Sequence, residues 1–270
     1  MKTRMTILML ALCLLSACQR SPRLIILHTN DTHSHFEPLR GGEQAGKCGV
    51  IERAAFIDSI RTVYGEDKVL LLDAGDFSQG TSYFSELNGQ LEPRIINDMR
   101  YDCVTLGNHE FDNDIEALHQ RLAMLENTKV VSANIDLSQF PISEIVKPCT
   151  VIERAGLKIG IIGLESNLST NVSASISSRI PQLDNVESIN KWSSYLHDSE
   201  KCDLIILLSH LGYDKDQDVI PSTRHIDIVI GGHTHTFVDD FIYVKDLDGK
   251  KVPIITDGCW GEQVGMITVW

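Results

Sequence analysis

The sequence predicts an α/β fold in which much of the strand pairing is parallel. Short apolar runs rich in β-branched residues alternate with stretches of helical periodicity along the 270-residue chain. The runs are almost continuously apolar, as expected of strands that are covered on both faces. Strands that alternate with helices are typical of this fold class. A chain of this length can bury a substantial core, as one large domain or two small ones.

The expected elements follow one another in a regular order. Seven strands are predicted at residues 24–27, 69–72, 103–106, 130–131, 157–162, 204–208 and 226–230. Four helices are predicted between them, at residues 49–64, 92–99, 114–125 and 186–199. Residues 166–181 are rich in serine and asparagine, so we expect a long exposed loop there.

The pattern changes after Asp240. Two short apolar runs, at residues 241–244 and 252–255, flank the sequence Leu247-Asp248-Gly249. Asp-Gly between such runs is a strong hairpin signal. Residues 266–270 are then expected to form a last strand.

The first 17 residues are expected to be a lipoprotein signal peptide. Lys2 and Arg4 precede an apolar run, and small residues follow it, as in secretory signals. The order Leu15-Ser16-Ala17-Cys18 resembles a bacterial lipobox, so Cys18 would be acylated and residues 18–23 would be a short tether. An ordinary signal peptide that is cleaved nearby is the alternative. We therefore expect a lipid-anchored protein of the bacterial cell envelope that faces the periplasm or the exterior.

Charge and cysteine usage narrow the possible partners. The chain has 37 acidic and 24 basic residues, a net charge of −13. This balance disfavours a nucleic-acid polymer as partner and suits a protein that holds divalent cations. Five cysteines follow Cys18, and no two of them form a Cys-x-x-Cys pair. We predict neither a disulfide framework nor zinc–thiolate chemistry, and we expect Cys103 and Cys202 to be buried free thiols.

Polar clusters follow five of the predicted strands. They occupy residues 28–33, 73–76, 107–110, 209–210 and 231–235. Ligands of open α/β sheets bind beyond the carboxyl ends of the strands. We therefore expect the carboxylates and imidazoles of these clusters to meet at one edge.

The candidate ligands in these clusters are oxygen and nitrogen donors without sulfur. They are Asp31, His33, Asp76, Asn108, His210, His233 and His235. Such a set suits zinc, manganese, iron or magnesium. Seven side chains are too many for one catalytic ion with open positions, so we predict two divalent metal ions that share a carboxylate.

The same residues resemble a known family. Asp31-x-His33, Gly75-Asp76, Gly107-Asn108-His109-Glu110, His210 and Gly232-His233-x-His235 occur in the order found in metallophosphoesterases. Asp73-Ala-Gly-Asp76, Gln79-Gly-Thr81, residues 107–112 and residues 132–135 are similar to the 5'-nucleotidase branch of that family. The resemblance covers residues 24–270 and implies a four-layered α/β/β/α sandwich of two mixed sheets between helices.

The resemblance also implies roles for individual residues. Asp31, His33, Asp76 and His235 would hold one ion, and Asp76, Asn108, His210 and His233 would hold the other. His109 and Asp112 would be the catalytic pair. His109 adjoins a ligand, so it could face the phosphate and protonate the leaving oxygen. Asp112 could fix the tautomer of His109, although it could instead cap the helix that begins near Asp114.

The expected activity is hydrolysis of small phosphate monoesters, with nucleoside 5'-monophosphates as the expected substrates. A phosphodiesterase that acts on 2',3'-cyclic nucleotides or nucleotide sugars is the first alternative. Members of the 5'-nucleotidase branch carry a second domain that binds the base, which we expect to be absent here or to be supplied by a separate nucleotide-binding chain. A catalytic or metal-binding subunit completed by such a chain is the second alternative. Aromatic residues are sparse near the motifs, so no wall for a nucleobase is evident.

Overall fold

The computed structural model describes residues 21–43 and 45–270, so the predicted signal peptide and the predicted acylation site at Cys18 lie outside the described residues. The strands are β1 (Leu24–Thr29), β2 (Val69–Asp73), β3 (Cys103–Thr105), β4 (Lys129–Val131), β5 (Val146–Lys147), β6 (Cys149–Arg154), β7 (Leu157–Leu164), β8 (Leu204–Ser209), β9 (Ile228–Gly231), β10 (Ile242–Lys245), β11 (Lys251–Ile255) and β12 (Gly265–Val269). The α-helices are α1 (Val50–Tyr64), α2 (Ser82–Leu87), α3 (Leu91–Met99), α4 (Ile115–Leu122), α5 (Leu168–Asn171), α6 (Ala174–Ser177), α7 (Asn185–Ser194) and α8 (Tyr213–Val219).

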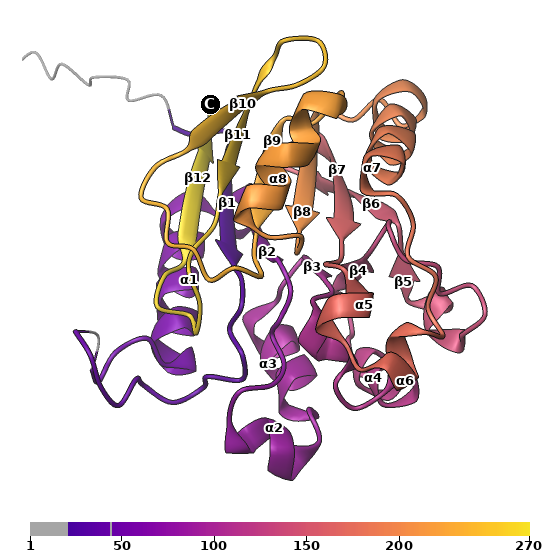
Figure 1. Cartoon of the computed structure of the whole chain (residues 1–270). Helices are drawn as coiled ribbons and strands as arrows, with labels where there is room; N and C mark the ends of the chain where they lie inside the picture. Colours follow the sequence, from indigo (N-terminus) through magenta and orange to yellow (C-terminus); the bar gives the residue numbers. More distant parts are fainter. Residues whose placement is uncertain (1–20, 44) are drawn as a thin grey trace, which may run out of the picture.

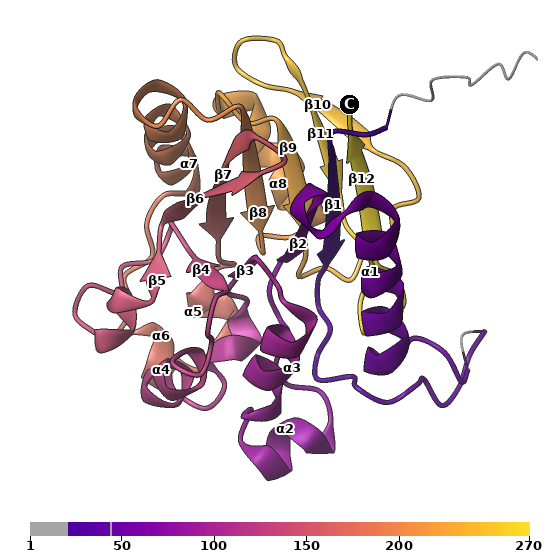
Figure 2. The same ribbon diagram turned by 180° about the vertical axis from the view of Figure 1, so that it is seen from behind.

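The strands form two mixed sheets of six. One sheet has the order β12-β1-β2-β3-β4-β5 and the other has the order β10-β11-β9-β8-β7-β6. Figures 1 and 2 show α8 on one side of the two sheets and α1 on the other. The predicted sandwich of two mixed sheets between helices is thus confirmed.

Three apolar clusters hold these layers together. Two successive residues of β1 belong to different clusters. Ile25 packs toward α1, α3 and α4, whereas Ile26 packs between the sheets. A third cluster places Ile189 of α7 and Val219 of α8 against the outer face of the second sheet. Successive residues of a strand point to opposite faces, so a nearly continuous apolar run supplies two clusters at once.

Parallel pairing brings the carboxyl ends of neighbouring strands to the same edge of a sheet. β1, β2, β3 and β4 are parallel neighbours, and so are β7, β8 and β9. The carboxyl ends within each parallel set therefore meet at one edge. The predicted hairpin is present, since β10 and β11 pair antiparallel around Asp248 and Gly249.

Several regions differ from the sequence prediction. The helices α2 and α8 and the short strand β5 were not predicted. The expected loop at residues 166–181 was wrong in part, because it contains the short helices α5 and α6. Strand β6 was not predicted and pairs antiparallel with β7. Its two-residue turn, Ala155 and Gly156, has φ values of 55° and 69°, as hairpin turns require. β6 was missed because it is only partly buried and lacks the continuous apolar run of its neighbours.

The five cysteines among the described residues are free. Cys103 is buried, as predicted, whereas Cys202 is only partly buried. Within residues 21–43 and 45–270, no helix is both long enough and apolar enough to cross a membrane.

Candidate functional site

The loops that follow β1, β2, β3, β8 and β9 meet at one edge of the two sheets (Figure 1). We call the seven predicted ligands the metal rim, namely Asp31, His33, Asp76, Asn108, His210, His233 and His235. Six of them, all except Asn108, fall into compact groups whose ligand atoms lie within 4.8 Å of one another. The convergence predicted from the strand ends is therefore present in the structure.

The first group consists of Asp31, His33 and His235. The Nε2 atoms of His33 and His235 are 2.9 Å apart. Asp31 Oδ1 lies 3.4 Å from the Nε2 of His235 and 3.9 Å from that of His33. These three atoms could hold one cation.

The second group consists of Asp76, His210 and His233. Asp76 Oδ2 lies 3.0 Å from His210 Nε2 and 3.9 Å from His33 Nε2. Asp76 thus faces a member of the first group and a member of the second. A carboxylate in this position could be shared between two cations.

Asn108 adjoins the second group through the chain. It begins the turn Asn108–Phe111 that follows β3, and the next residue, His109, donates its backbone N–H to Asp76 Oδ1 at 2.9 Å. The Asn108 side chain is buried, and its Oδ1 accepts from Ser166 Oγ at 3.4 Å. Its amide oxygen is thus held beside the rim.

The nitrogens of the rim are arranged to accept a cation. His210 Nδ1 donates to the carbonyl of Ala74 at 2.7 Å, so the lone pair of the neutral ring is on Nε2. Among the described residues, that buried Nε2 has no hydrogen-bond partner of acceptable geometry. A metal-bound histidine typically donates its other N–H to a carbonyl or carboxylate in this way. The donor set and the unpartnered nitrogen therefore fit a divalent metal ion.

The backbone of the rim is strained. Five of the seven rim residues have left-handed φ values, between 47° at His33 and 76° at His233. This conformation costs a non-glycine residue on the order of 1–3 kcal/mol. A Cβ atom at Gly107 would lie 2.3 Å from Asp76 Oδ1. The rim is therefore packed so tightly that its backbone conformations are imposed by the surrounding fold.

Burial and neighbouring charges shift the pKa values of the acidic and basic side chains at this edge of the sheets. Burial favours the neutral form of Asp76, but the neighbouring His210 holds the pKa of Asp76 well below its usual value. Burial also opposes charge on His210, yet Asp76 raises the pKa of His210 well above the ordinary range. The hydrogen bonds of Asp31 and Cys259 raise the pKa of His235 to about 10. The edge therefore favours positive charge at His210 and His235, whereas burial lowers the pKa of His33 and of His233.

His109 and Asp112 form a pair at the mouth of the rim. His109 Nδ1 donates to Asp112 Oδ2 at 2.8 Å, and both side chains are partly exposed. This hydrogen bond raises the pKa of His109. The ring of His109 meets the ring of His33 edge to face, with 5.3 Å between centroids. Asp112 thus fixes the proton on Nδ1 and leaves Nε2 free to act.

The sequence analysis assigned no role to Glu110, which holds two loops of the site together. Its carboxylate accepts the backbone N–H groups of Asp76, Ser78 and Gly107 at 2.8, 2.9 and 2.7 Å. Glu110 is fully buried, and burial, together with the charge of Asp76, raises its pKa to about 8. Its place directly after Asn108-His109 was the only available signal.

Two asparagines outside the predicted set also touch the rim. Asn30 donates to Asp31 Oδ2 at 2.6 Å and to the carbonyl of Gly258 at 2.7 Å. Asn171, at the end of α5, lies 3.4 Å from His233 Nε2. Asp73, three residues before the rim residue Asp76, accepts from Thr29 Oγ1 and Gly75 N. The contacts of Asn30 and Asn171 with the rim could not be predicted from sequence spacing.

The comparisons with known proteins agree with this geometry. The sequence profile of the family described as calcineurin-like phosphoesterase matches residues 24–237. A snake venom 5'-nucleotidase from Gloydius brevicauda is 34% identical over 94% of this chain and 46% of its own length. A probable 5'-nucleotidase from Treponema pallidum is 34% identical over 92% of this chain and 43% of its own length.

Solved structures give the same result. The 5'-nucleotidase precursor from Thermus thermophilus has a TM-score of 0.82 and 33% identity, over 90% of this chain and 50% of that one. The NAD nucleotidase of Haemophilus influenzae has a TM-score of 0.80 and 28% identity, over 91% and 46%. The chain thus spans about half the length of these relatives.

Proposed function

We propose that this chain, which belongs to the calcineurin-like phosphoesterase family, hydrolyses phosphate monoesters with the help of two divalent cations. We further propose that nucleoside 5'-monophosphates are its substrates, because the relatives above are named 5'-nucleotidases. The observation that carries the proposal is the position of Asp76. Its carboxylate faces His33 of one ligand group and His210 of the other, as a shared ligand must.

The residues of the site support specific roles. Two divalent cations, when bound, would neutralise the phosphoryl oxygens and acidify a water molecule. His109 stands beside the rim with its Nδ1 proton held by Asp112. Because that hydrogen bond raises the pKa of His109, it favours the protonated ring, which could donate from Nε2 to the leaving oxygen. A group positioned in this way typically contributes a factor of about 10²–10⁴ to the rate.

Metal content and phosphate release test the proposal together. We expect close to two transition-metal equivalents per chain, loss of hydrolysis with a chelator, and recovery with manganese or zinc. Phosphate should be released from AMP and from an aryl phosphate. Absence of bound metal, together with no recovery of activity, would contradict the proposal.

The same assay separates the alternatives. Preference for 2',3'-cyclic AMP or for a nucleotide sugar would identify a phosphodiesterase instead. Retained metal with no hydrolysis of any ester would indicate a subunit that needs another chain. A separate nucleotide-binding chain is the partner we propose for that case, and it should raise kcat/KM for AMP more than for the aryl phosphate.

We also propose that the protein is exported and anchored by lipid on Cys18. The motif that supports this, Leu15-Ser16-Ala17-Cys18, lies outside the described residues. Cys18→Ser should move the protein from the membrane fraction to the soluble fraction of its host. Unchanged fractionation of this variant would remove the lipid anchor from the proposal.

A further inference from the structure

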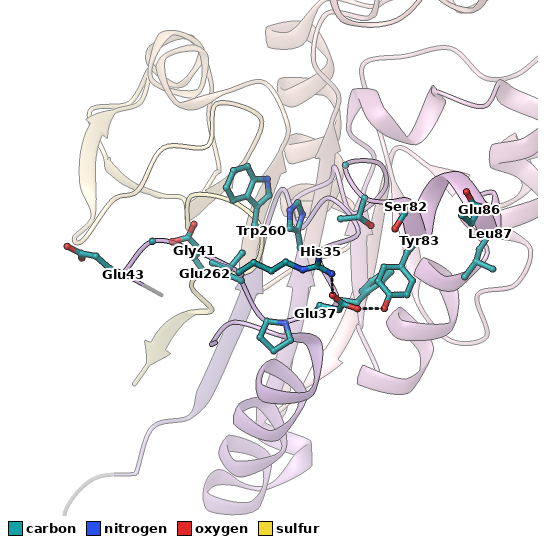
Figure 3. Close-up of a pocket in the computed structure, with 17 residues that line it drawn as sticks. His35, Glu37, Gly41, Glu43, Ser82, Tyr83, Glu86, Leu87, Trp260 and Glu262 are labelled. Carbon is teal, nitrogen blue, oxygen red and sulfur yellow. Dashed lines mark hydrogen bonds and ion pairs between the residues drawn. The ribbon is translucent and has the colours of Figure 1, made fainter. Parts of the chain in front are cut away.

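A large cavity opens next to the loop that follows the rim residue His33, and Figure 3 shows the side chains that line it. Its volume is about 1180 Å³. Three segments far apart in the sequence form its walls: the loop after β1, helix α2 with the two residues before it, and the loop before β12. We call it the Trp260 cavity, because Trp260 is its largest exposed aromatic side chain, 39% exposed.

The walls of the cavity are continuous with the metal rim. Trp260 donates its backbone N–H to the carbonyl of Asp31 at 2.7 Å. His35 follows the rim residue His33 by two positions, and its Nδ1 donates to the carbonyl of His33 at 2.9 Å. Thr81 Oγ1 donates to the carbonyl of Ser34 at 2.9 Å. The part of an ester that projects from a phosphate on the rim would therefore have this cavity beside it.

Contacts with His35 and Arg53 hold Trp260 in place. Its ring stacks on that of His35, with 5.0 Å between centroids and 23° between planes. One guanidinium orients both residues, since Arg53 donates to the carbonyl of His35 at 3.0 Å and to that of Trp260 at 3.2 Å. Arg53 itself is buried. The exposed indole is therefore fixed before any ligand arrives, which reduces the entropy lost on binding.

A second aromatic pair forms another part of the wall. The rings of Phe36 and Tyr83 meet edge to face, with 5.5 Å between centroids. Figure 3 shows Tyr83 away from Trp260, hydrogen-bonded to Glu37. Aromatic faces of this kind bind planar groups by stacking.

The charges of the cavity restrict what it accepts. Its charged lining residues are Glu37, Glu43, Glu86, Glu262 and Arg40. The single guanidinium is already paired, because Arg40 Nη2 lies 2.7 Å from Glu37 Oε2. Carboxylates in excess repel anions and tolerate neutral or cationic groups.

We propose that the Trp260 cavity binds the leaving group of the phosphate ester, that this group is planar, aromatic and without negative charge, and that Trp260 is its stacking surface. A nucleobase without an acidic substituent fits this description. The proposal rests on the proposed function, because it assigns the cavity to the alcohol part of the same ester. It adds a basis for substrate selection that the metal rim cannot supply.

Adenosine binding to metal-free protein tests the proposal without catalysis. The dissociation constant is measured by equilibrium dialysis in the presence of a chelator. Trp260→Ala should raise it about fivefold to a hundredfold, the value of one base stack. Trp260→Phe keeps an aromatic ring and should raise the dissociation constant less. This variant still tests the proposal if the alanine variant fails to fold.

Trp270 supplies the matched control. It is 68% exposed, but it follows the end of β12 that pairs with the start of β1, at the opposite edge of the sheet. Trp270→Ala should leave the dissociation constant unchanged. Equal effects of the two alanine substitutions, or no binding of adenosine by the wild-type protein, would overturn the proposal.

A charge test completes the experiment. Orotidine, whose base carries a carboxylate, should bind more weakly than adenosine. Glu86→Lys together with Glu262→Lys should reduce that difference, and an unchanged difference would overturn the charge argument. Adenosine binding without phosphate release from AMP would leave the cavity assigned and would contradict the proposed function, so the two failures are distinguishable.

Discussion

The metal rim and the Trp260 cavity share the backbone around Asp31 and His33, yet they differ in burial and in construction. Asp31, Asp76 and His210 are at most 2% exposed, and they follow strands whose pairing fixes them. The walls of the cavity come from loops and from the short helix α2, with Glu37 and Trp260 exposed. The rim thus depends on the sheet, whereas the cavity depends on a few contacts such as those of Arg53.

The difference separates two kinds of function. A site that fixes charge must be dry and rigid, because preorganised groups in a low dielectric stabilise charge most strongly. A site that accepts varied leaving groups can be open and solvated. We therefore expect substitutions in the rim to abolish chemistry, and substitutions around the cavity to change affinity.

The largest effect is expected at the centre of the rim. Asp76→Asn should lose both metal and activity, because an amide cannot serve as a shared anionic ligand for two cations. Asp73→Asn is the matched control, since Asp73 is equally buried three residues earlier, but its side chain, among the described residues, bonds only to Thr29 and Gly75. Elemental analysis and phosphate release measure both variants. Equal metal loss from the two would mean that general disruption of the loop, rather than ligation by Asp76, is responsible.

The next effect separates chemistry from metal binding within the rim. His109→Ala should keep the metal while kcat falls by roughly 10²–10⁴. Asp112→Asn should cause a smaller fall and move the pH profile to lower pH, because the hydrogen bond of Asp112 raises the pKa of His109. Metal content is measured beside kcat. Loss of metal from His109→Ala would make His109 a ligand rather than a catalytic residue.

The contrast also explains what the sequence could predict. The rim residues stand directly after apolar strands, so strand ends and short motifs predicted His33, Asp76 and His210 as neighbours. The cavity has no such signal, because His35 and Trp260 are 225 positions apart and meet only through the antiparallel return of β12 beside β1. Sequence spacing therefore could not predict an aromatic wall for a nucleobase. Strand β6 was missed for a related reason, since its half-buried residues lack the pattern of a central strand.

A pair of glycine substitutions sharpens the comparison. Gly107→Ala would place a Cβ 2.3 Å from Asp76 Oδ1 and 2.7 Å from His210 Nε2. Overpacking of this kind costs about 1–3 kcal/mol, and metal affinity should fall with it. Gly42, on the cavity loop, has open space around it and a φ of 79°, so Gly42→Ala should cost about 1 kcal/mol through backbone strain alone.

Thermal unfolding and metal content distinguish the two glycine variants. Gly42→Ala should keep its metal and lose only stability. If Gly107→Ala kept full metal affinity, the rim would be more pliable than its contacts indicate, and the contrast with the cavity would weaken.

The last contrast concerns the pH dependence of stability, where buried and exposed carboxylates should differ in sign. Burial raises the pKa of Asp216, beside the His210 loop, to about 7, whereas an unfolded aspartate ionises near 3.9. Between these values the folded chain keeps a proton that the unfolded chain has lost. This group therefore lowers the free energy of unfolding as pH rises from about 4 to about 7, by at most about 1.4 kcal/mol per pH unit. Asp216→Asn should remove that slope.

The exposed carboxylate of Glu37, at the cavity, is the control for Asp216. Hydrogen bonds from Arg40 and Tyr83 lower the pKa of Glu37, so its stabilising effect is present above the unfolded pKa and is lost only at lower pH. Glu37→Gln should therefore leave the slope between about pH 5 and pH 7 unchanged. Urea unfolding of the metal-free protein across this range measures both variants. If Glu37→Gln reduced this slope as much as Asp216→Asn did, burial would not explain the difference in pH dependence between the two regions.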